Sequence, residues 1–128
     1  MNTLINDFFD KYSKALTSYS AVAITSFYQV PLAVYSDEGV RLVSKESETL
    51  AFWEQGVEPY KKKGIERAAF KIVMEEQLSE HNFVAKVLWI NYDASYKEVS
   101  QETNFYILTK KDEQLKISGL IIMANSAF

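Results

Sequence analysis

The sequence has 128 residues, 48% of them hydrophobic and 24% charged, which predicts one globular domain over residues 1–128. Its formal net charge of -3 is opposite to the basic excess by which proteins attract nucleic acids and anionic membranes, so we expect neither as a partner. The lack of cysteine excludes thiol catalysis, disulfide bonds and thiolate metal ligands.

The first part of the chain has the pattern of two helices. Apolar residues recur at spacings of three and four between about Asn2 and Ser18, which is typical of one amphipathic helix. The hydroxyl of Ser20 can accept a hydrogen bond from a free N–H group of a following turn, so a short second helix is expected over residues 21–27. Pro31 prevents this helix from continuing.

A hairpin and a third helix are predicted next. Two apolar stretches, residues 32–35 and 40–43, flank a turn in which Gly39 can adopt the positive φ of a tight reversal. Apolar residues then recur with a roughly helical period, which predicts a helix over about residues 46–62. Pro59 lies inside this span and removes one helical hydrogen bond, so a bend is allowed there.

From Arg67 onward, long stretches of alternating polarity predict four antiparallel strands, separated by turns near residues 80–81, 95–96 and 112–113. The more apolar face of this sheet should be concave and should pack on the helices. We therefore predict an α+β fold, with three N-terminal helices and a short hairpin packed on a strongly curved four-stranded antiparallel sheet.

The opposite face of the sheet is half apolar, and its apolar residues form a stripe that is too contiguous to remain in water. A second subunit is the simplest cover, which predicts a homodimer that forms through the outer sheet face. The predicted stripe consists of Leu88, Ile90, Phe105, Ile107, Leu120 and Ile122.

Aromatic and polar side chains on the concave side are candidate ligand-binding residues, because small-molecule pockets combine apolar walls with a few polar groups. Packing of a filled core explains the same residues equally well. Gly119, expected opposite Tyr106, would leave room for a cavity. The candidates are Tyr28, Tyr35, Trp53, Trp89, Asn104 and Tyr106.

Glu102 is the candidate catalytic residue, because the expected register places this carboxylate opposite Trp89 on the concave face. A desolvated carboxyl can move protons near neutrality, and a phenol such as Tyr106 could stabilise an oxyanion during enolisation of a carbonyl compound. The alternative is that Glu102 reaches solvent at the rim and has no chemical role.

Other chemistry is disfavoured. His81 is the single histidine and is expected in a solvated turn between two strands. The carboxylates do not repeat at the spacing of a metal site, and the four glycines do not form a phosphate-binding loop, so we expect no metal and no cofactor. The opening residues lack the pattern of a secretion signal, and no apolar run is long enough for a membrane span, so a cytoplasmic location is expected.

Three helices interrupted by a hairpin and followed by a long curved sheet resemble the nuclear transport factor 2-like superfamily. Nearly the whole chain resembles an uncharacterised bacterial branch of it. The local strings that carry the resemblance are Phe27-Tyr28-Gln29-Val30-Pro31-Leu32, Ser36-Asp37-Glu38-Gly39, Phe52-Trp53, and the strand pair of residues 106–108 and 115–123.

This resemblance implies a cone-shaped, half-open barrel with a pocket between helices and sheet. The superfamily holds ketosteroid isomerases, dehydratases, polyketide cyclases, ligand binders and association domains, so the fold does not determine the function. Its enzymes often carry histidine or a carboxylate on the pocket face of the last strands. Here Ile117, Ile121 and Met123 are expected there, which counts against a carried-over catalytic site.

Three functions remain open at this point. The first is a domain that binds a small, mostly apolar molecule in its cone and dimerises through the outer sheet face. The second is a small isomerase or dehydratase that uses Glu102 as general base. The third is an association module whose cone is filled by its own side chains. A cavity measurement separates the third function from the other two.

Overall fold

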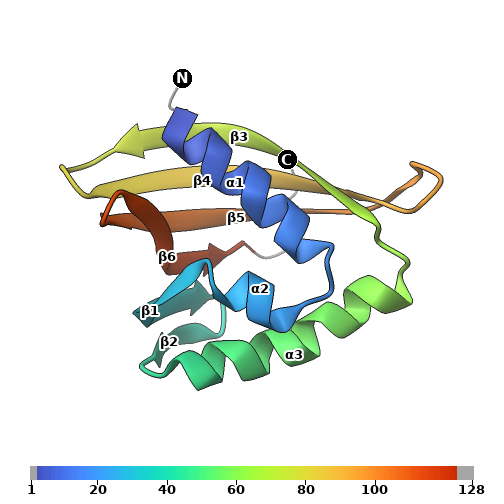
Figure 1. Cartoon of the computed structure of the whole chain (residues 1–128), viewed down its shortest axis with the longest axis horizontal. Coiled ribbons are helices and arrows are strands. Elements are labelled where there is room, and N and C mark those ends of the chain that lie inside the picture. The colour runs from blue at the N-terminus through green and yellow to red at the C-terminus, as the bar shows by residue number, and fades with distance from the viewer. Residues whose placement is uncertain (1–2, 124–128) are drawn as a thin grey trace.

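The computed structural model describes residues 3–123, and none of the helices in this range is long and apolar enough to cross a membrane. Three helices pack on one face of a curved sheet (Figure 1). In chain order the elements are α1 (Thr3–Leu16), α2 (Ala21–Thr25), β1 (Tyr28–Ser36), β2 (Gly39–Val43), α3 (Glu46–Lys62), β3 (Arg67–Gln77), β4 (Asn82–Tyr92), β5 (Glu98–Lys111) and β6 (Gln114–Ile122).

The sheet has six strands in the order β2-β1-β6-β5-β4-β3, and its β1–β6 pair is parallel. The α+β class is confirmed, but the expected four-stranded antiparallel sheet is wrong. The hairpin of β1 and β2 is part of the sheet, because Val34 of β1 pairs with Leu120 of β6. Nothing in the local sequence indicates this pairing, since parallel neighbours are joined by long connections.

The predicted helices are present, with shifts at their ends. The first helix was predicted from about Asn2 to Ser18, and Asn2 lies outside the described residues. Helix α1 ends at Leu16, shortly before Tyr19, whose φ is 61°. The second helix ends at Thr25 rather than at residue 27, and the hydroxyl of Ser20 accepts the N–H of Ala23 as expected for a cap. The third helix has the predicted bounds and continues through Pro59.

A bulge in β6 reverses the predicted direction of its last side chains. Leu108 pairs with Ile117 but Ile107 pairs with Gly119, so β6 contains one extra residue. Gly119 therefore lies on the outer face, under Ile107, and a Cβ atom on it would lie 2.8 Å from Ile107 Cδ1. Leu120, not Gly119, pairs with Tyr106. The expectation that Gly119 leaves room in the cone is wrong.

The bulge also changes which side chains of β6 lie on each face of the sheet, so part of the predicted outer stripe is wrong. Beyond it, Leu120 and Ile122 line the space under the helices, while Ile121 is carried to the outer face. Met123 follows the end of β6. The residues of the predicted outer stripe that keep their place are Leu88, Ile90, Phe105 and Ile107.

An aromatic cluster forms the core between α1 and the sheet. Helix α1 crosses the concave face and contacts β3, whereas α3 runs beside β1 and β2 (Figure 1). The rings of Phe9 and Tyr106 lie 5.0 Å apart between their centroids, and those of Tyr12 and Trp89 lie 5.9 Å apart. This cluster fills the part of the cone under α1, and the remaining space lies toward α3.

Candidate ligand-binding site

A cavity of about 190 Å³ lies between α3, the end of α1 and the concave face of the sheet. Phe52, Glu102 and Ile122 are exposed to solvent and mark its mouth, whereas Tyr12 and Tyr106 are buried at its base. The lining consists of Tyr12, Leu16, Tyr28, Phe52, Trp53, Gly56, Tyr60, Glu102, Asn104, Tyr106, Leu120 and Ile122.

Two regular elements supply most of this lining. Trp53, Gly56 and Tyr60 lie on one face of α3, because residues three and four apart in a helix are neighbours. Gly56 has a steric role there, since a Cβ atom on it would lie 3.1 Å from Cε3 of the Trp53 ring. In β5, Glu102 and Tyr106 lie on the same face because side chains alternate along a strand.

The phenol of Tyr106 is held by two donors. Its oxygen accepts the indole N–H of Trp89 at 2.9 Å and the amide N–H of Asn104 at 3.5 Å. Within residues 3–123 its own proton has no acceptor, so the hydroxyl can donate to a molecule in the cavity. Burial and then the neighbouring Tyr28 raise the pKa of Tyr106 well above its ordinary value. The phenol is therefore a neutral donor.

Tyr28 presents a second phenol to the same cavity. Its oxygen lies 2.7 Å from that of Tyr12. Burial raises the pKa of Tyr28 to about 12, against the lowering effect of the neighbouring Tyr12 and Trp53 side chains. When the hydroxyl of Tyr12 donates to Tyr28, the proton of Tyr28 is free for a ligand oxygen.

Glu102 lies at the mouth, where its Oε1 accepts the hydroxyl proton of Tyr60 at 3.0 Å. Burial, and then the negative charge of Glu102, raise the pKa of Tyr60 well above its ordinary value. The register that pairs Trp89 with Glu102 is as predicted. The carboxylate is exposed, whereas the general-base hypothesis assumes a desolvated one.

The structure brings five of the predicted site residues together around this one cavity. Their role in binding or catalysis stays a prediction. The five are Tyr28, Trp53, Glu102, Asn104 and Tyr106.

Two predicted residues lie elsewhere. Trp89 is 1% exposed and stands behind Tyr106, which it holds by a hydrogen bond. Tyr35 pairs with Val40 and Ile121 on the outer face, because Leu32 and Val34 take the inward positions of β1. The placement of Tyr35 in the pocket is therefore wrong.

Sequence reasoning missed Tyr12 and Tyr60 as lining residues. The signal for Tyr60 was present, since it follows Trp53 by seven residues and so lies on the same helix face. Tyr12 was included in the apolar stripe of the first helix, and no local pattern indicates that its hydroxyl reaches Tyr28.

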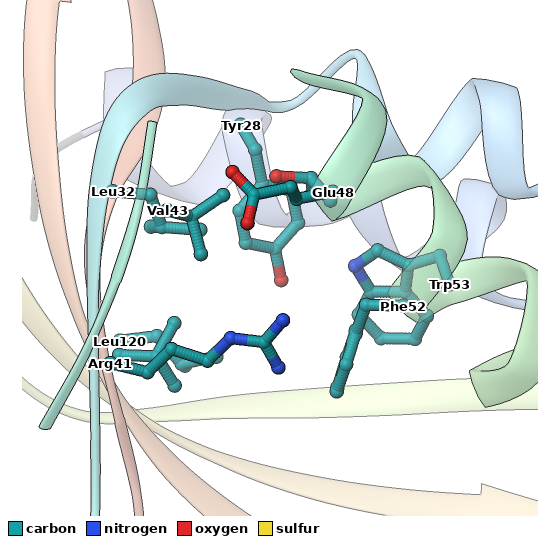
Figure 2. A pocket seen from close by; sticks show the side chains of 10 residues that line it. Tyr28, Leu32, Arg41, Val43, Glu48, Phe52, Trp53 and Leu120 are labelled. Carbon is teal, nitrogen blue, oxygen red and sulfur yellow. The ribbon is translucent and has the colours of Figure 1, made fainter. Parts of the chain in front are cut away.

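A smaller cavity of about 50 Å³ adjoins the first one and shares Tyr28, Phe52, Trp53 and Leu120 with it. Figure 2 shows the guanidinium of Arg41 and the hydroxyl of Tyr28 pointing into this space. The full lining is Tyr28, Leu32, Val34, Arg41, Val43, Glu48, Thr49, Phe52, Trp53 and Leu120.

His81 is exposed in the turn between β3 and β4, and its side chain lies outside both cavities. No group of three or more histidine, aspartate or glutamate side chains in the described part of the chain could hold a metal ion.

Tyr106 and Tyr60 both line the cavity, but the hydrogen bond of Tyr106 with Trp89 is buried and that of Tyr60 with Glu102 is exposed. This difference gives a matched stability test. Tyr106→Phe leaves the buried N–H of Trp89 without its acceptor, so we expect the free energy of unfolding to fall by about 1–3 kcal/mol. Tyr60→Phe removes a bond to an exposed carboxylate and should cost no more than about 0.5 kcal/mol. Urea unfolding of both variants measures the difference, and equal losses would contradict the burial argument.

Helices on the concave face of a curved six-stranded sheet, with a cavity between them, define the class of NTF2-like cone folds. The model of one family of this class matches residues 2–125, and the chain belongs to that family, described as NTF2-like protein (DUF6841). The resemblance to the nuclear transport factor 2-like superfamily is thus confirmed. No curated protein matches the sequence.

Solved structures with the same fold have low sequence identity. A Nostoc punctiforme domain of unknown function with a cystatin-like fold is 18% identical, with a TM-score of 0.74 over 98% of this chain and 78% of its own. An NTF-2 like protein of unknown function from Shewanella oneidensis is 18% identical, with a TM-score of 0.72 over 93% and 95%. A ketosteroid isomerase-like protein from Erwinia carotovora atroseptica is 11% identical, with a TM-score of 0.66 over 98% and 96%. These likenesses show the fold.

Proposed function

We propose that this protein binds a small, mostly apolar molecule that carries an oxygen acceptor. The observation that supports this proposal is the pair of neutral phenols, Tyr28 and Tyr106, whose hydroxyls face one cavity with apolar and aromatic walls. Fixed donors of this kind recognise a carbonyl or a similar oxygen, and the apolar walls hold the rest of the molecule.

The size of the cavity limits the ligand. An apolar cavity of about 150 Å³ in another protein binds benzene. The larger of the two cavities described above, which we call the central cavity, has a volume of about 190 Å³. It is open to solvent at a mouth that includes Phe52 and Ile122. A ligand of one or two rings fits this space, and a longer molecule would extend into solvent at the mouth.

The test uses 2-acetonaphthone, a neutral two-ring ketone, and the indole N–H resonances of the two tryptophans in 15N-labelled protein. Trp53 lines the cavity and Trp89 donates to Tyr106, so the ketone should shift both resonances in a saturable titration. Naphthalene, which lacks the oxygen, should bind about tenfold more weakly, because the phenols then lose their acceptor. Unchanged resonances at the solubility limit of the ketone would contradict the proposal.

We also propose that two copies of the chain associate through the outer sheet face. Beside the stripe of Leu88, Ile90, Phe105 and Ile107, the strands β1 and β2 add apolar side chains to this face. Leu42 is 74% exposed, Val40 61% and Tyr35 40%. A twofold contact covers the same patch on both copies, and contiguous apolar side chains on a surface often mark such a contact.

The alternative function is a small isomerase or dehydratase. The convergence of Glu102, Asn104 and two phenols on one cavity favours it, because a base and oxyanion donors would then face the same substrate. The exposure of Glu102 weighs against it, since a general base of matched pKa is usually desolvated. The cavity itself weighs against an association module with a filled core.

Glu102→Gln separates binding from catalysis, because it keeps the shape of the side chain and removes the base. For a binding protein, we expect the affinity for 2-acetonaphthone to change by less than about threefold, since Glu102 lies at the mouth and not beside the phenols that hold the oxygen. A catalysed enolisation would instead lose turnover by a factor of about 100 to 10,000. Exchange of the α-protons of 2-acetonaphthone for deuterium measures that reaction, and enzyme-dependent exchange would contradict the binding function.

A further inference from the structure

The smaller cavity contains a positive charge without an ionic partner. Arg41 extends from β2 into it (Figure 2), and no carboxylate in residues 3–123 lies within salt-bridge distance of its guanidinium. Glu48 also lines this cavity, but its Oε1 accepts the backbone N–H groups of Ser44 and Lys45 at the start of α3. Arg41 is exposed at the side of this pocket, so its guanidinium is available to an anion that enters, and its planar fork can hold a carboxylate by two parallel hydrogen bonds.

A second and independent group in the same cavity lacks a partner. Thr49 is 4% exposed and lines the cavity, and its Oγ1 atom has no hydrogen-bond partner within the described residues. A buried hydroxyl without a partner costs free energy, so a group that reached the Oγ1 atom from the cavity would be stabilised there. Figure 2 shows the indole nitrogen of Trp53 turned toward the hydroxyl of Tyr28 at the side where the two cavities adjoin.

The size of the smaller cavity selects the kind of anion. About 50 Å³ holds three or four atoms, since one water occupies about 10–15 Å³ in this measure. A planar carboxylate matches both this volume and the flat fork of one guanidinium. A phosphate carries more charge and more oxygens than one arginine and one hydroxyl can satisfy. Each cavity has one carboxylate in its lining, Glu48 in the smaller and Glu102 in the central one, whereas the guanidinium of Arg41 lines only the smaller cavity, so the anionic end should point toward Arg41.

We propose that the smaller cavity is a carboxylate subsite and that the ligand is an apolar carboxylic acid. Its carboxylate binds Arg41, Thr49 and the phenol of Tyr28, and its rings fill the central cavity. This inference rests on the proposed binding function and names the ligand class of the same site.

The test compares 2-naphthoate with the neutral 2-acetonaphthone, which has a similar two-ring body. Isothermal titration calorimetry should give at least about tenfold tighter binding of 2-naphthoate. Arg41→Gln should weaken 2-naphthoate by about tenfold to a hundredfold and change 2-acetonaphthone by less than about threefold. The matched control is Arg67→Gln, which removes the other arginine of the chain, a side chain stacked on Tyr96 at the far edge of the sheet. This control should leave both affinities unchanged.

The outcomes distinguish the subsite from the proposed function. Binding of the ketone without a preference for 2-naphthoate overturns the carboxylate subsite and leaves the binding function standing. An equal loss of both probes in Arg41→Gln also overturns the subsite, because it indicates a general structural role for Arg41. Failure of both probes to bind the wild-type protein overturns the subsite together with the binding function.

Discussion

Phe105→Lys is expected to convert a dimer into a monomer. Phe105 lies between Lys86 of β4 and Ile121 of β6, in the middle of the outer face. In a twofold dimer both copies of the new lysine would be buried, and each buried ammonium without a partner costs several kcal/mol. We therefore expect the dissociation constant to rise by a factor of at least about 100, which corresponds to about 2.7 kcal/mol.

Light scattering at micromolar concentration measures this effect. The wild-type protein should have twice the 14.7 kDa mass of one chain, and Phe105→Lys should have the mass of one chain. Leu78→Lys is the matched control, because Leu78 is 60% exposed beyond the end of β3 and away from the middle of the outer face. A wild-type mass of 14.7 kDa, or a Phe105→Lys dimer, would contradict the proposed association.

The buried phenols predict a steep loss of stability above about pH 10. Burial raises the pKa of Tyr28 to about 12, and it raises the pKa values of Tyr12 and Tyr106 well above their ordinary value. In the unfolded chain a tyrosine ionises near pH 10, so above that pH the unfolded state releases protons that the folded state retains. Stability is therefore complete below about pH 10 and decreases as the pH rises toward 12.

Each such phenol lowers the free energy of unfolding by about 1.4 kcal/mol per pH unit in this interval. Urea unfolding between pH 8 and about pH 11 gives the slope, and the near-ultraviolet absorbance of ionised tyrosine reports the titration directly. Tyr28→Phe should reduce the slope by up to that amount, because it removes one of the phenols. A stability that is equal at pH 8 and pH 11, or ionisation of all eight tyrosines near pH 10 in the folded protein, would contradict the assigned burial.

Local patterns determine what could be predicted of this fold. The periodicity of α1 and α3 and the alternation in β3 to β6 are properties of short segments, so these elements were found from the sequence. The parallel pairing of β1 with β6 joins segments more than 80 residues apart, and no turn fixes its register. The four-stranded prediction failed at this pairing.

The difference between local patterns and long-range contacts also explains which parts of the site could be predicted. The register of Trp89 with Glu102 follows from one hairpin turn, and it correctly placed Glu102, Asn104 and Tyr106 on the concave face. The bulge between Ile117 and Gly119 changes the face of the residues that follow it, and the sequence carries no clear signal for this extra residue.

The errors at the hairpin have a related cause. Tyr35 was assigned inward because it is aromatic, yet the inward positions of β1 are those of Leu32 and Val34. Arg41 was not considered as a site residue, because the hairpin was predicted to pack on the four-stranded sheet and not to extend it. In the structure Arg41 pairs with Val34, so its side chain lies on the concave side of the sheet and lines the smaller cavity.

A crystal structure of the protein with 2-acetonaphthone tests the binding function most directly. We expect the naphthyl group in the central cavity, with the carbonyl oxygen within hydrogen-bond distance of the hydroxyl of Tyr28 or Tyr106. Density for the ketone only outside this cavity, or a cavity closed by its own side chains at saturating ketone, would contradict the account.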